Sequence, residues 1–190
     1  KELRLFCSSV REQSSLLSLE INFENCMNMS DEGLNYFVGV IMCLQRLLSL
    51  SLNFNHCPNI SEMGYTYVVR SIRSLVWLQR LELNFRKCDS IGDIATESIL
   101  EGLKGLLLLR RLKLNFSECN NLSDKGLNHL KEGLRYLANM ESLTLMLGKC
   151  KKLTDESLRH SGDLLKGMVC LKEFKLECSS LLSISDRGVK

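Results

Sequence analysis

The sequence predicts an α/β solenoid, a fold in which strand–helix units of similar sequence stack side by side. Three observations in the 190 residues predict it. Cysteines recur every 31 residues, a short segment of alternating apolar residues precedes each of them, and a helical apolar pattern follows. The regularly spaced cysteines are Cys26, Cys57, Cys88, Cys119 and Cys150. A constant period over five units is typical of a repeat architecture.

The strand of each unit is predicted from apolar residues at every second position. The first column contains Leu19, Leu50, Leu81, Leu112, Leu143 and Phe174, and the column two residues further on contains Ile21, Leu52, Leu83, Leu114, Leu145 and Leu176. A third column contains Phe23, Phe54, Phe85, Phe116, Leu147 and Cys178. Alternation with a period of two indicates a strand that buries one face.

A helix is predicted after each strand and a short loop. A residue type suited to the N-cap stands in five of six units, at Ser30, Ser61, Ser123, Thr154 and Ser185. The next residue is acidic in all six, which suits the positive end of a helix dipole: Asp31, Glu62, Asp93, Asp124, Asp155 and Asp186. Apolar residues then recur at helical spacing, as at Leu34, Phe37, Val38 and Ile41. Each unit therefore contains a strand, a loop, a capped helix and a short return.

This pattern resembles the leucine-rich repeat. The segment from Leu16 to Leu34 fits the form L-x-x-L-x-I-x-F-x-x-C-x-x-M-S-D-x-G-L, which is similar to the cysteine-containing and ribonuclease-inhibitor-like repeat types and to arrays in unicellular eukaryotes. The resemblance covers the whole chain. It implies a right-handed, horseshoe-shaped solenoid with a parallel sheet on the concave side and helices on the convex side. The period of 31 residues exceeds the usual 20–29 of this family, and the additional apolar pair predicts longer strands.

The whole chain, residues 1–190, is predicted to be one array. A helix of a preceding unit occupies 1–18, full units occupy about 19–49, 50–80, 81–111, 112–142 and 143–173, and a partial unit occupies 174–190. Neither end has a polar capping unit, which a solenoid needs for solubility. We therefore expect the chain to be a fragment of a longer array.

The residues that alternate with the buried ones are predicted to face the concave side. One such column contains Asn22, Asn53, Asn84 and Asn115, followed by Met146 and Glu177. Asn is depleted in strands, so four in register need a cause. Either the amides bond one another along the stack, or they form a polar surface that binds a partner. The predicted partner-binding residues are these four Asn together with Glu82, Arg86 and Lys113. Replacing three of the Asn by Ala is expected to weaken binding without loss of cooperative melting.

The five regularly spaced cysteines are predicted to be structural, as small buried side chains with weak S–H donors. A row of thiols could also bind a soft metal or oxidise, but no CxxC pair occurs, and His56, His129 and His160 have no companion ligands at metal-site spacing. Disulfide frameworks of secreted proteins use an even number of cysteines, and this chain has nine. Free thiols favour a reducing compartment, cytoplasmic or nuclear. No catalytic motif occurs, so we expect neither an enzyme nor a cofactor.

The charge pattern favours a protein partner. The net charge is +3 and aromatic residues make up 6%, so we expect no nucleic-acid partner, and no apolar run is long enough to span a membrane. Residues 1–100 carry 9 Lys and Arg against 11 Asp and Glu, whereas residues 101–190 carry 16 against 11. This gradient would suit an electrostatically steered partner or could be incidental. Trp77, Leu107 and Leu108 stand in returns between helix and strand, near Arg80, Arg110 and Arg111. They either pack in the turn or form an apolar contact patch.

The predicted function is therefore protein–protein recognition on the concave sheet, without chemistry. Three narrower hypotheses remain open. The resemblance suggests the substrate receptor of an F-box-type ubiquitin ligase. The alternatives are a structural component of a large cytoskeletal or ciliary assembly and the sensing region of a kinase or immune-type receptor. A solenoid fold alone does not choose among them.

Overall fold

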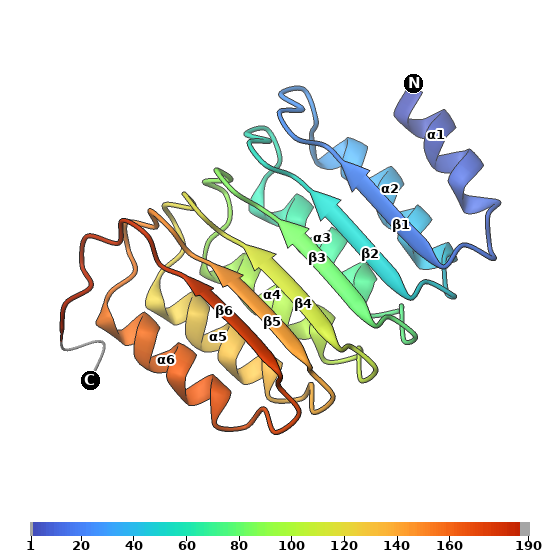
Figure 1. The fold of residues 1–190 in the computed structure, drawn as a ribbon. Helices are drawn as coiled ribbons and strands as arrows, with labels where there is room; N and C mark the ends of the chain where they lie inside the picture. The colour runs from blue at the N-terminus through green and yellow to red at the C-terminus, as the bar shows by residue number, and fades with distance from the viewer. Residues whose placement is uncertain (1, 187–190) are drawn as a thin grey trace.

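The computed structural model describes residues 2–186; Lys1 and residues 187–190, including the end of the expected unit 174–190, lie outside the described residues (Figure 1). Helices and strands alternate along the described chain. The order is α1 (Glu2–Arg11), β1 (Ser18–Asn22), α2 (Asp31–Cys43), β2 (Ser49–Asn53), α3 (Glu62–Ile72), β3 (Arg80–Asn84), α4 (Asp93–Leu103), β4 (Arg111–Asn115), α5 (Asp124–Leu134), β5 (Ser142–Met146), α6 (Asp155–Leu165) and β6 (Glu173–Glu177).

The six strands form one parallel sheet in chain order, β1 to β6, and the helices stack along one of its faces (Figure 1). Neighbouring strands pair in a register of 31 residues, so that Leu50 lies beside Leu81 and Leu81 beside Leu112. The sheet is open at both ends. This layout confirms the predicted α/β solenoid, because parallel pairing with a helical crossover between each pair of strands is what the repeated unit requires.

The core lies between the sheet and the helices. The Leu columns of β2 to β5 are buried, and the Phe column forms a stack in which consecutive ring centroids of Phe23, Phe54, Phe85 and Phe116 are 5.6, 5.9 and 5.8 Å apart. Tyr65 from α3 packs edge-on against Phe54 and Phe85. The expectation of longer strands is wrong. Each strand has five residues, and in the first four units the Phe lies one residue beyond its end.

The Cys column joins each unit to the one before it. The thiols of Cys57, Cys88, Cys119 and Cys150 each donate to the carbonyl of the Phe in the preceding unit, at 3.0–3.1 Å. Cys57, Cys88, Cys119 and Cys150 are buried, while Cys26, which stands in the first unit, is half-buried. The predicted structural role of this column therefore has a specific geometry: the thiol satisfies a buried carbonyl at the point where the chain leaves the strand.

The acidic column forms a second connection between units, at the helix N-termini. In four places the Asp carboxylate accepts from both the backbone N–H and the hydroxyl of the N-cap residue one unit on, as Asp93 does from Ser123 at 3.1 and 2.7 Å. The exception is Glu62, which faces Gly92 and reaches past it to the N–H of Ala95 at 3.0 Å. A longer carboxylate and a missing N-cap side chain thus occur together.

Candidate functional site

The face of the sheet that no helix covers carries the predicted partner-binding residues, and we call it the open sheet face (Figure 1). Its residues are the strand positions that alternate with the buried Leu. On this face Glu82 and Asn84 are half-buried and Lys113 is exposed. Arg86 follows β3 at the carboxyl-end rim of the same face. The structure therefore brings the predicted residues of β2 to β4 onto one continuous surface.

The Asn column does not form the expected ladder of amides. The side-chain oxygens of Asn22, Asn53, Asn84 and Asn115 each accept the backbone N–H two residues further on, at 2.9–3.1 Å. This is an Asx turn, in which a short amide side chain closes the backbone at a strand end. Asn115 is also buried, with 8% of its surface exposed, which is less than the alternation predicted; its role as a contact residue stays a prediction. The register of these Asn residues therefore reflects the end of each strand, where the same turn recurs.

Two groups of polar contacts cross the open sheet face between adjacent strands. Lys113 of β4 bonds Glu82 of β3, its direct partner in the strand register. Near the other end of the face, Glu24 accepts from the amide of Asn55 at 2.7 Å and from that of Asn53 at 3.4 Å. The charges predicted to recognise a partner are therefore already paired within the array. A partner would meet an ordered pattern of alternating charge.

Arg86 and Glu118 form the most extensively bonded ion pair at the carboxyl-end rim of the sheet. The Nε and one terminal nitrogen of Arg86 both donate to one oxygen of Glu118, at 3.0 and 2.7 Å. Glu118 is the residue just before Cys119 and has a left-handed backbone with φ of 64°. The hydrogen bond from Arg86 holds the pKa of Glu118 below its usual range. The pair places a fixed positive and a fixed negative group beside the end of β4.

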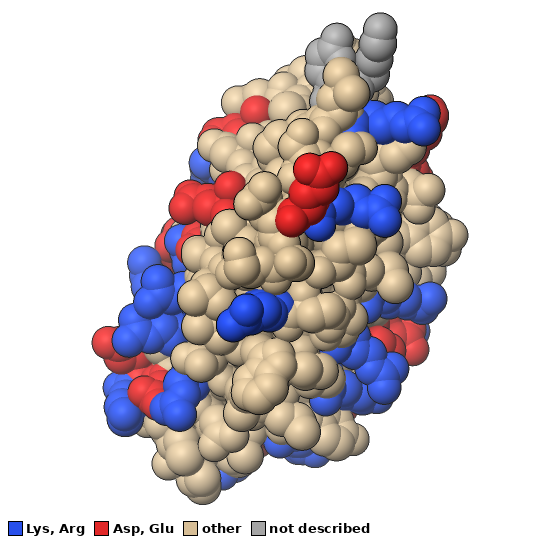
Figure 2. All heavy atoms as spheres, turned by 90° about the vertical axis from the view of Figure 1, so that its right-hand side faces the viewer, with Lys and Arg blue, Asp and Glu red and all other residues tan. Residues whose placement is uncertain are grey.

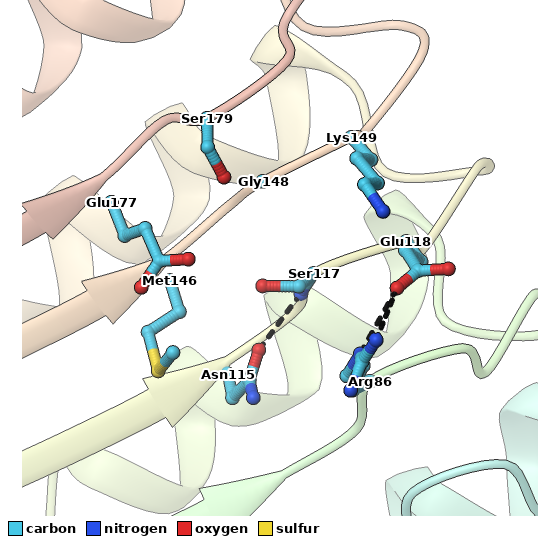
Figure 3. A pocket seen from close by; sticks show the side chains of 9 residues that line it. All are labelled: Arg86, Asn115, Ser117, Glu118, Met146, Gly148, Lys149, Glu177 and Ser179. Atoms are coloured by element: carbon cyan, nitrogen blue, oxygen red, sulfur yellow. Dashed lines mark hydrogen bonds and ion pairs between the residues drawn. The ribbon is translucent and has the colours of Figure 1, made fainter.

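A pocket of about 310 Å³ opens beside this ion pair, at the carboxyl ends of β4 to β6 (Figure 3). Polar and charged side chains line it, with Met146 as the apolar exception: Arg86, Asn115, Ser117, Glu118, Met146, Lys149, Glu177 and Ser179, together with Gly148. The hydroxyl of Ser117 is buried and makes no hydrogen bond within the described residues, although the Ser117 backbone is held by Asn115 at 3.0 Å. A buried hydroxyl without a partner is costly, so a ligand atom that bonds it would be stabilised.

Sequence reasoning missed most of this pocket. Glu118, Lys149 and Glu177 were not selected, because Glu118 and Lys149 stand in the loop after the strand and Glu177 breaks the Asn column. A signal was available. The residues just before the regular cysteines, Asn25, His56, Lys87, Glu118 and Lys149, and their counterpart Ser180, share a left-handed backbone, with φ of 55–64°. This fixed conformation places the carboxylate or ammonium group of that position at the rim of the open sheet face.

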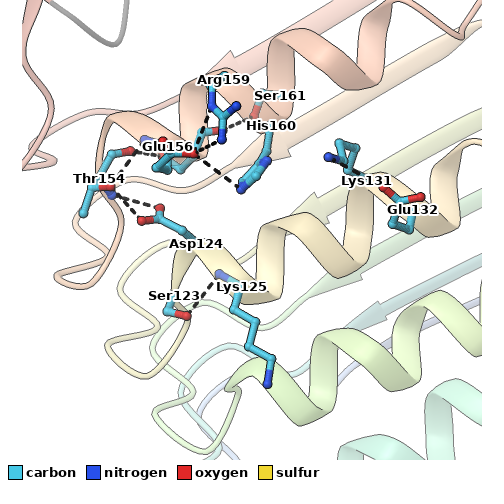
Figure 4. A network of polar contacts seen from close by, with 11 residues as sticks. Ser123, Asp124, Lys125, Lys131, Glu132, Thr154, Glu156, Arg159, His160 and Ser161 are labelled. Carbon is cyan, nitrogen blue, oxygen red and sulfur yellow. Dashed lines mark hydrogen bonds and ion pairs between the residues drawn. The ribbon is translucent and has the colours of Figure 1, made fainter.

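The opposite side of the molecule carries a separate polar network along α5 and α6 (Figure 4). Asp124 accepts from the backbone and the hydroxyl of Thr154 at 3.0 and 2.7 Å. Glu156 accepts from Arg159 at 2.9 Å and has His160 4.0 Å away, both on its own helix. These contacts cap helices and join adjacent units, so they account for their own residues without a ligand.

The environment of the buried thiols in the Cys column disfavours their reactive thiolate form. Burial raises the pKa of Cys57 and of Cys150 to about 11, and it raises the pKa of Cys88 and Cys119 as well. A protonated thiol is neither a nucleophile nor a good metal ligand. Within the described part of the chain, no three or more His, Cys, Asp or Glu residues are grouped so as to hold a metal ion. No described helix is both long and apolar enough to cross a bilayer.

The fold defines a leucine-rich-repeat-type α/β solenoid, and solved structures of this kind resemble it. The C-terminal domain of tropomodulin from Caenorhabditis elegans has a TM-score of 0.60 at 14% identity, over 88% of this chain and 93% of that chain. Actin-binding site 2 of leiomodin-1 has a TM-score of 0.57 at 13% identity, over 85% and 86%. A chain of the yeast Rad7 and Elc1 complex has a TM-score of 0.50 at 16% identity, over 98% and 51%.

At these identities the likeness is one of fold alone. The sequence matches no protein-family model and no curated protein.

Proposed function

We propose that this protein is a non-catalytic scaffold that binds a protein partner on the open sheet face. The observation that carries the proposal is the pocket at the ends of β4 to β6, where the buried Ser117 hydroxyl has no hydrogen-bond partner among residues 2–186. Around it, Arg86 and Glu118 are fixed by their mutual hydrogen bonds, so little conformational entropy is lost when they contact a partner. Protein partners of the structural neighbours, actin and Elc1 among them, support a partner of this class.

The test uses two variants that exchange charges without breaking ion pairs. Glu82→Lys combined with Lys113→Glu reverses one pair, and Arg86→Glu combined with Glu118→Arg reverses the other. Each variant keeps opposite charges in contact, so the fold is retained, while a partner meets the opposite pattern. A matched control exchanges Glu101 of α4 with Lys104, the residue that follows the helix; this half-buried pair on the helix side bonds at 2.6 Å.

The measurement is affinity capture from the source cells, followed by titration of each captured protein against the purified variants. We expect both open-face variants to weaken binding by about tenfold or more, because a like-charge contact replaces an attractive one. The control should bind as the unchanged protein does. If all three variants bind their partner equally well, the open sheet face is not the contact surface.

A second candidate function is a structural role in a cytoskeletal or ciliary assembly. The likeness to a leiomodin-1 actin-binding segment favours it, although that likeness is one of fold. Co-sedimentation with actin filaments, and gel filtration with monomeric actin, would test it directly. The substrate-receptor hypothesis for an F-box-type ubiquitin ligase rests on the resemblance of the repeats, and stable co-purification with ligase subunits would distinguish it.

Three further proposals accompany the scaffold function. The repeats belong to the cysteine-containing, ribonuclease-inhibitor-like type, which the thiol-to-carbonyl bonds of the Cys column support. The chain has no enzymatic activity of its own. The protein works in a reducing compartment, cytoplasmic or nuclear, because all nine cysteines are free thiols. Imaging of the tagged protein in its own cells tests the last of these.

A further inference from the structure

The turns that return helices α2 to α6 to the next strand share one design. Two apolar residues, spaced three apart, are buried or nearly so and fix the turn, as Leu75 and Leu78 do after α3 and Leu106 and Leu109 do after α4. The two residues between these anchors point outward. Because the anchors hold the turn, the outward pair is rigid and its side chains are free to vary between units.

In the middle of the array these outward pairs are large and apolar. Val76 and Trp77 are 50% and 57% exposed, and Leu107 and Leu108 in the next turn are 59% and 40% exposed. The other turns carry the pairs Gln45–Arg46, Ala138–Asn139 and Val169–Cys170. Adjacent units lie about 5 Å apart along a parallel sheet, so the two apolar pairs form one surface. Four such side chains together exceed what a soluble surface exposes at random.

Arginines stand beside this apolar surface, where the next strands begin. Arg80 and Arg111 are the first residues of β3 and β4 and lie directly opposite each other in the strand register. Both are exposed, and neither forms an ion pair within the described residues. Like charges placed opposite each other destabilise a sheet. Arg110 lies next to them and bonds Glu141. The three arginines and Glu141 line a hollow of about 330 Å³.

Figure 2 shows the side of the molecule on which the return turns lie. Tan residues cover much of this side, single blue and red side chains interrupt them near the middle, and blue Lys and Arg side chains lie on both flanks with red Asp and Glu among them. The apolar character of this edge comes from Trp77, Leu107 and Leu108, and its unpaired positive charge comes from Arg80 and Arg111. Arg80 and Arg111 lie at the amino ends of β3 and β4, on the rim of the open sheet face, and unlike Glu82 and Lys113 they form no ion pair within the described residues.

We propose that the edge formed by the return turns after α3 and α4 is a second binding surface, which takes an acidic segment of a partner protein that carries large apolar side chains. The apolar side chains of the segment pack on Trp77, Leu107 and Leu108. Its carboxylates bond Arg80 and Arg111 and remove the repulsion between them. The proposal does not depend on the pocket at the ends of β4 to β6 or on the pairs Glu82–Lys113 and Arg86–Glu118, and it would survive the failure of that site.

A nucleic acid fits this edge less well. Single strands bind on successive aromatic platforms, whereas the outward side chains here are aliphatic apart from Trp77. Glu141 also stands inside the arginine cluster, bonded to Arg110 and to Lys172 at 3.0 Å. A carboxylate in that position repels phosphates and leaves only Arg80 and Arg111 available. Two unpaired arginines match a short acidic peptide better than a polyanion.

The test uses Trp77 as a reporter, since it is the only tryptophan in the chain. The probe is a synthetic peptide of alternating Glu and Leu, titrated into the 190-residue protein while Trp77 emission is followed. Two comparison peptides alternate Glu with Ser and Lys with Leu, and an oligothymidylate serves as the nucleic acid. We expect only the Glu–Leu peptide to shift the emission at micromolar concentration, with affinity that falls as salt is raised.

Two variants copy residues that the chain itself uses at the same positions in other units. Arg80→Ser with Arg111→Ser copies Ser49 and Ser142, and Leu107→Ala with Leu108→Asn copies Ala138 and Asn139. Each of these two variants should lower the affinity for the Glu–Leu peptide by about tenfold or more. The arginine variant should melt no lower than the unchanged protein, because a repulsive pair has been removed. Lys125→Glu on α5, another exposed position, should leave peptide binding unchanged.

Four outcomes would overturn the proposal. The Glu–Leu peptide could leave Trp77 emission unchanged, or both copied variants could bind the peptide as tightly as the unchanged protein does. The oligothymidylate could bind more tightly than the peptide, or the protein could self-associate in a way that the Leu107 and Leu108 variant abolishes. The last would make this edge an interface between two copies of the chain. Loss of peptide binding in both variants, with their melting unchanged or raised, supports the acidic segment.

Discussion

The connection between units at the helix N-termini should be a major determinant of stability, and Asp93 tests it. Its carboxylate accepts three hydrogen bonds from the next unit: from the backbone N–H groups of Ser123 and Gly126, at 3.1 and 3.0 Å, and from the Ser123 hydroxyl at 2.7 Å. Gly126 is buried, and a Cβ added there would lie 2.7 Å from the same carboxylate. The carboxylate therefore occupies the space that a side chain would need.

Asp93→Ala removes all three bonds and leaves the Gly126 N–H without a protein acceptor. Hydrogen bonds to a charged group contribute about 1.5–3 kcal/mol each when buried, and water will replace part of this at a half-buried site. We expect a loss of about 2–3 kcal/mol in the free energy of unfolding. Asp93→Asn keeps an oxygen for the two N–H groups and loses the charge at two helix N-termini, so it should cost about 1 kcal/mol.

The assay is urea denaturation followed by circular dichroism, with the slope compared between variants so that midpoint shifts can be converted to free energy. The matched control is Asp163→Ala, which removes a half-buried carboxylate of α6 that bonds Lys166, the residue that follows the helix, at 2.8 Å. A pair of that kind contributes about 0.5 kcal/mol or less. If Asp93→Ala costs no more than Asp163→Ala, the connection between units does not stabilise the array.

Three further predictions concern the thiols, the left-handed column and the rim ion pair. Exposed Cys170 should be alkylated by iodoacetamide first, while Cys119 reacts only when the array opens, because it is buried and its pKa is raised. Lys87→Gly should raise stability by about 0.5 kcal/mol, because a side chain at φ of 57° is strained and glycine is not. Glu118→Gln should lower stability by about 0.5 kcal/mol at neutral pH, since the exposed Arg86 partner is screened by solvent. Because the folded pKa of Glu118 lies below its unfolded value of about 4.3, this contribution is present above about pH 4.3 and is lost as the pH falls through the folded pKa.

For each of these three predictions, one measurement gives a result that would contradict it. Peptide mass mapping after a short alkylation pulse would contradict the first prediction if Cys119 were modified as fast as Cys170. Lys125→Gly, in the first turn of α5, should destabilise by up to about 1 kcal/mol, so a loss of similar size for Lys87→Gly would refute the strain argument. For Glu118→Gln, a stability difference that persists unchanged at pH 2 would show that the ion pair is not its cause.

The sequence predicts much of the fold because the residue type stays constant from unit to unit at the buried positions. The Leu columns at Leu50 and Leu81 alternate with a period of two, and only a strand with one buried face explains them. The paired occurrence of Glu62 and Gly92 is equally visible in the sequence. Its meaning required geometry, because the carboxylate acts on the following unit and not on its own helix.

The candidate site was less predictable, because it lies where the repeat drifts. Ser117 and Lys149 stand at positions whose residue types vary from unit to unit, so the residue type gives no signal there. The burial of the Ser117 hydroxyl without a hydrogen bond among the described residues, and the position of exposed Lys149 beside it, appear only when β4, β5 and β6 are assembled. The exposed returns are an intermediate case. Trp77 was recognised as either packed or exposed, and the anchors Leu75 and Leu78 decide the matter by filling the turn themselves.

The Asn column shows how a periodic polar residue can mimic a binding surface. Alternation places Asn53 and Asn84 on the open sheet face, and that placement is correct. Their oxygens nevertheless close the backbone at Asn55 and Arg86, so replacing these Asn by Ala would loosen the strand ends and lower the melting temperature. Loss of binding in such a variant would not distinguish recognition from folding. The charge exchanges at Glu82 and Lys113 and at Arg86 and Glu118 avoid this difficulty, because they invert what a partner meets and preserve the contacts that hold the array together.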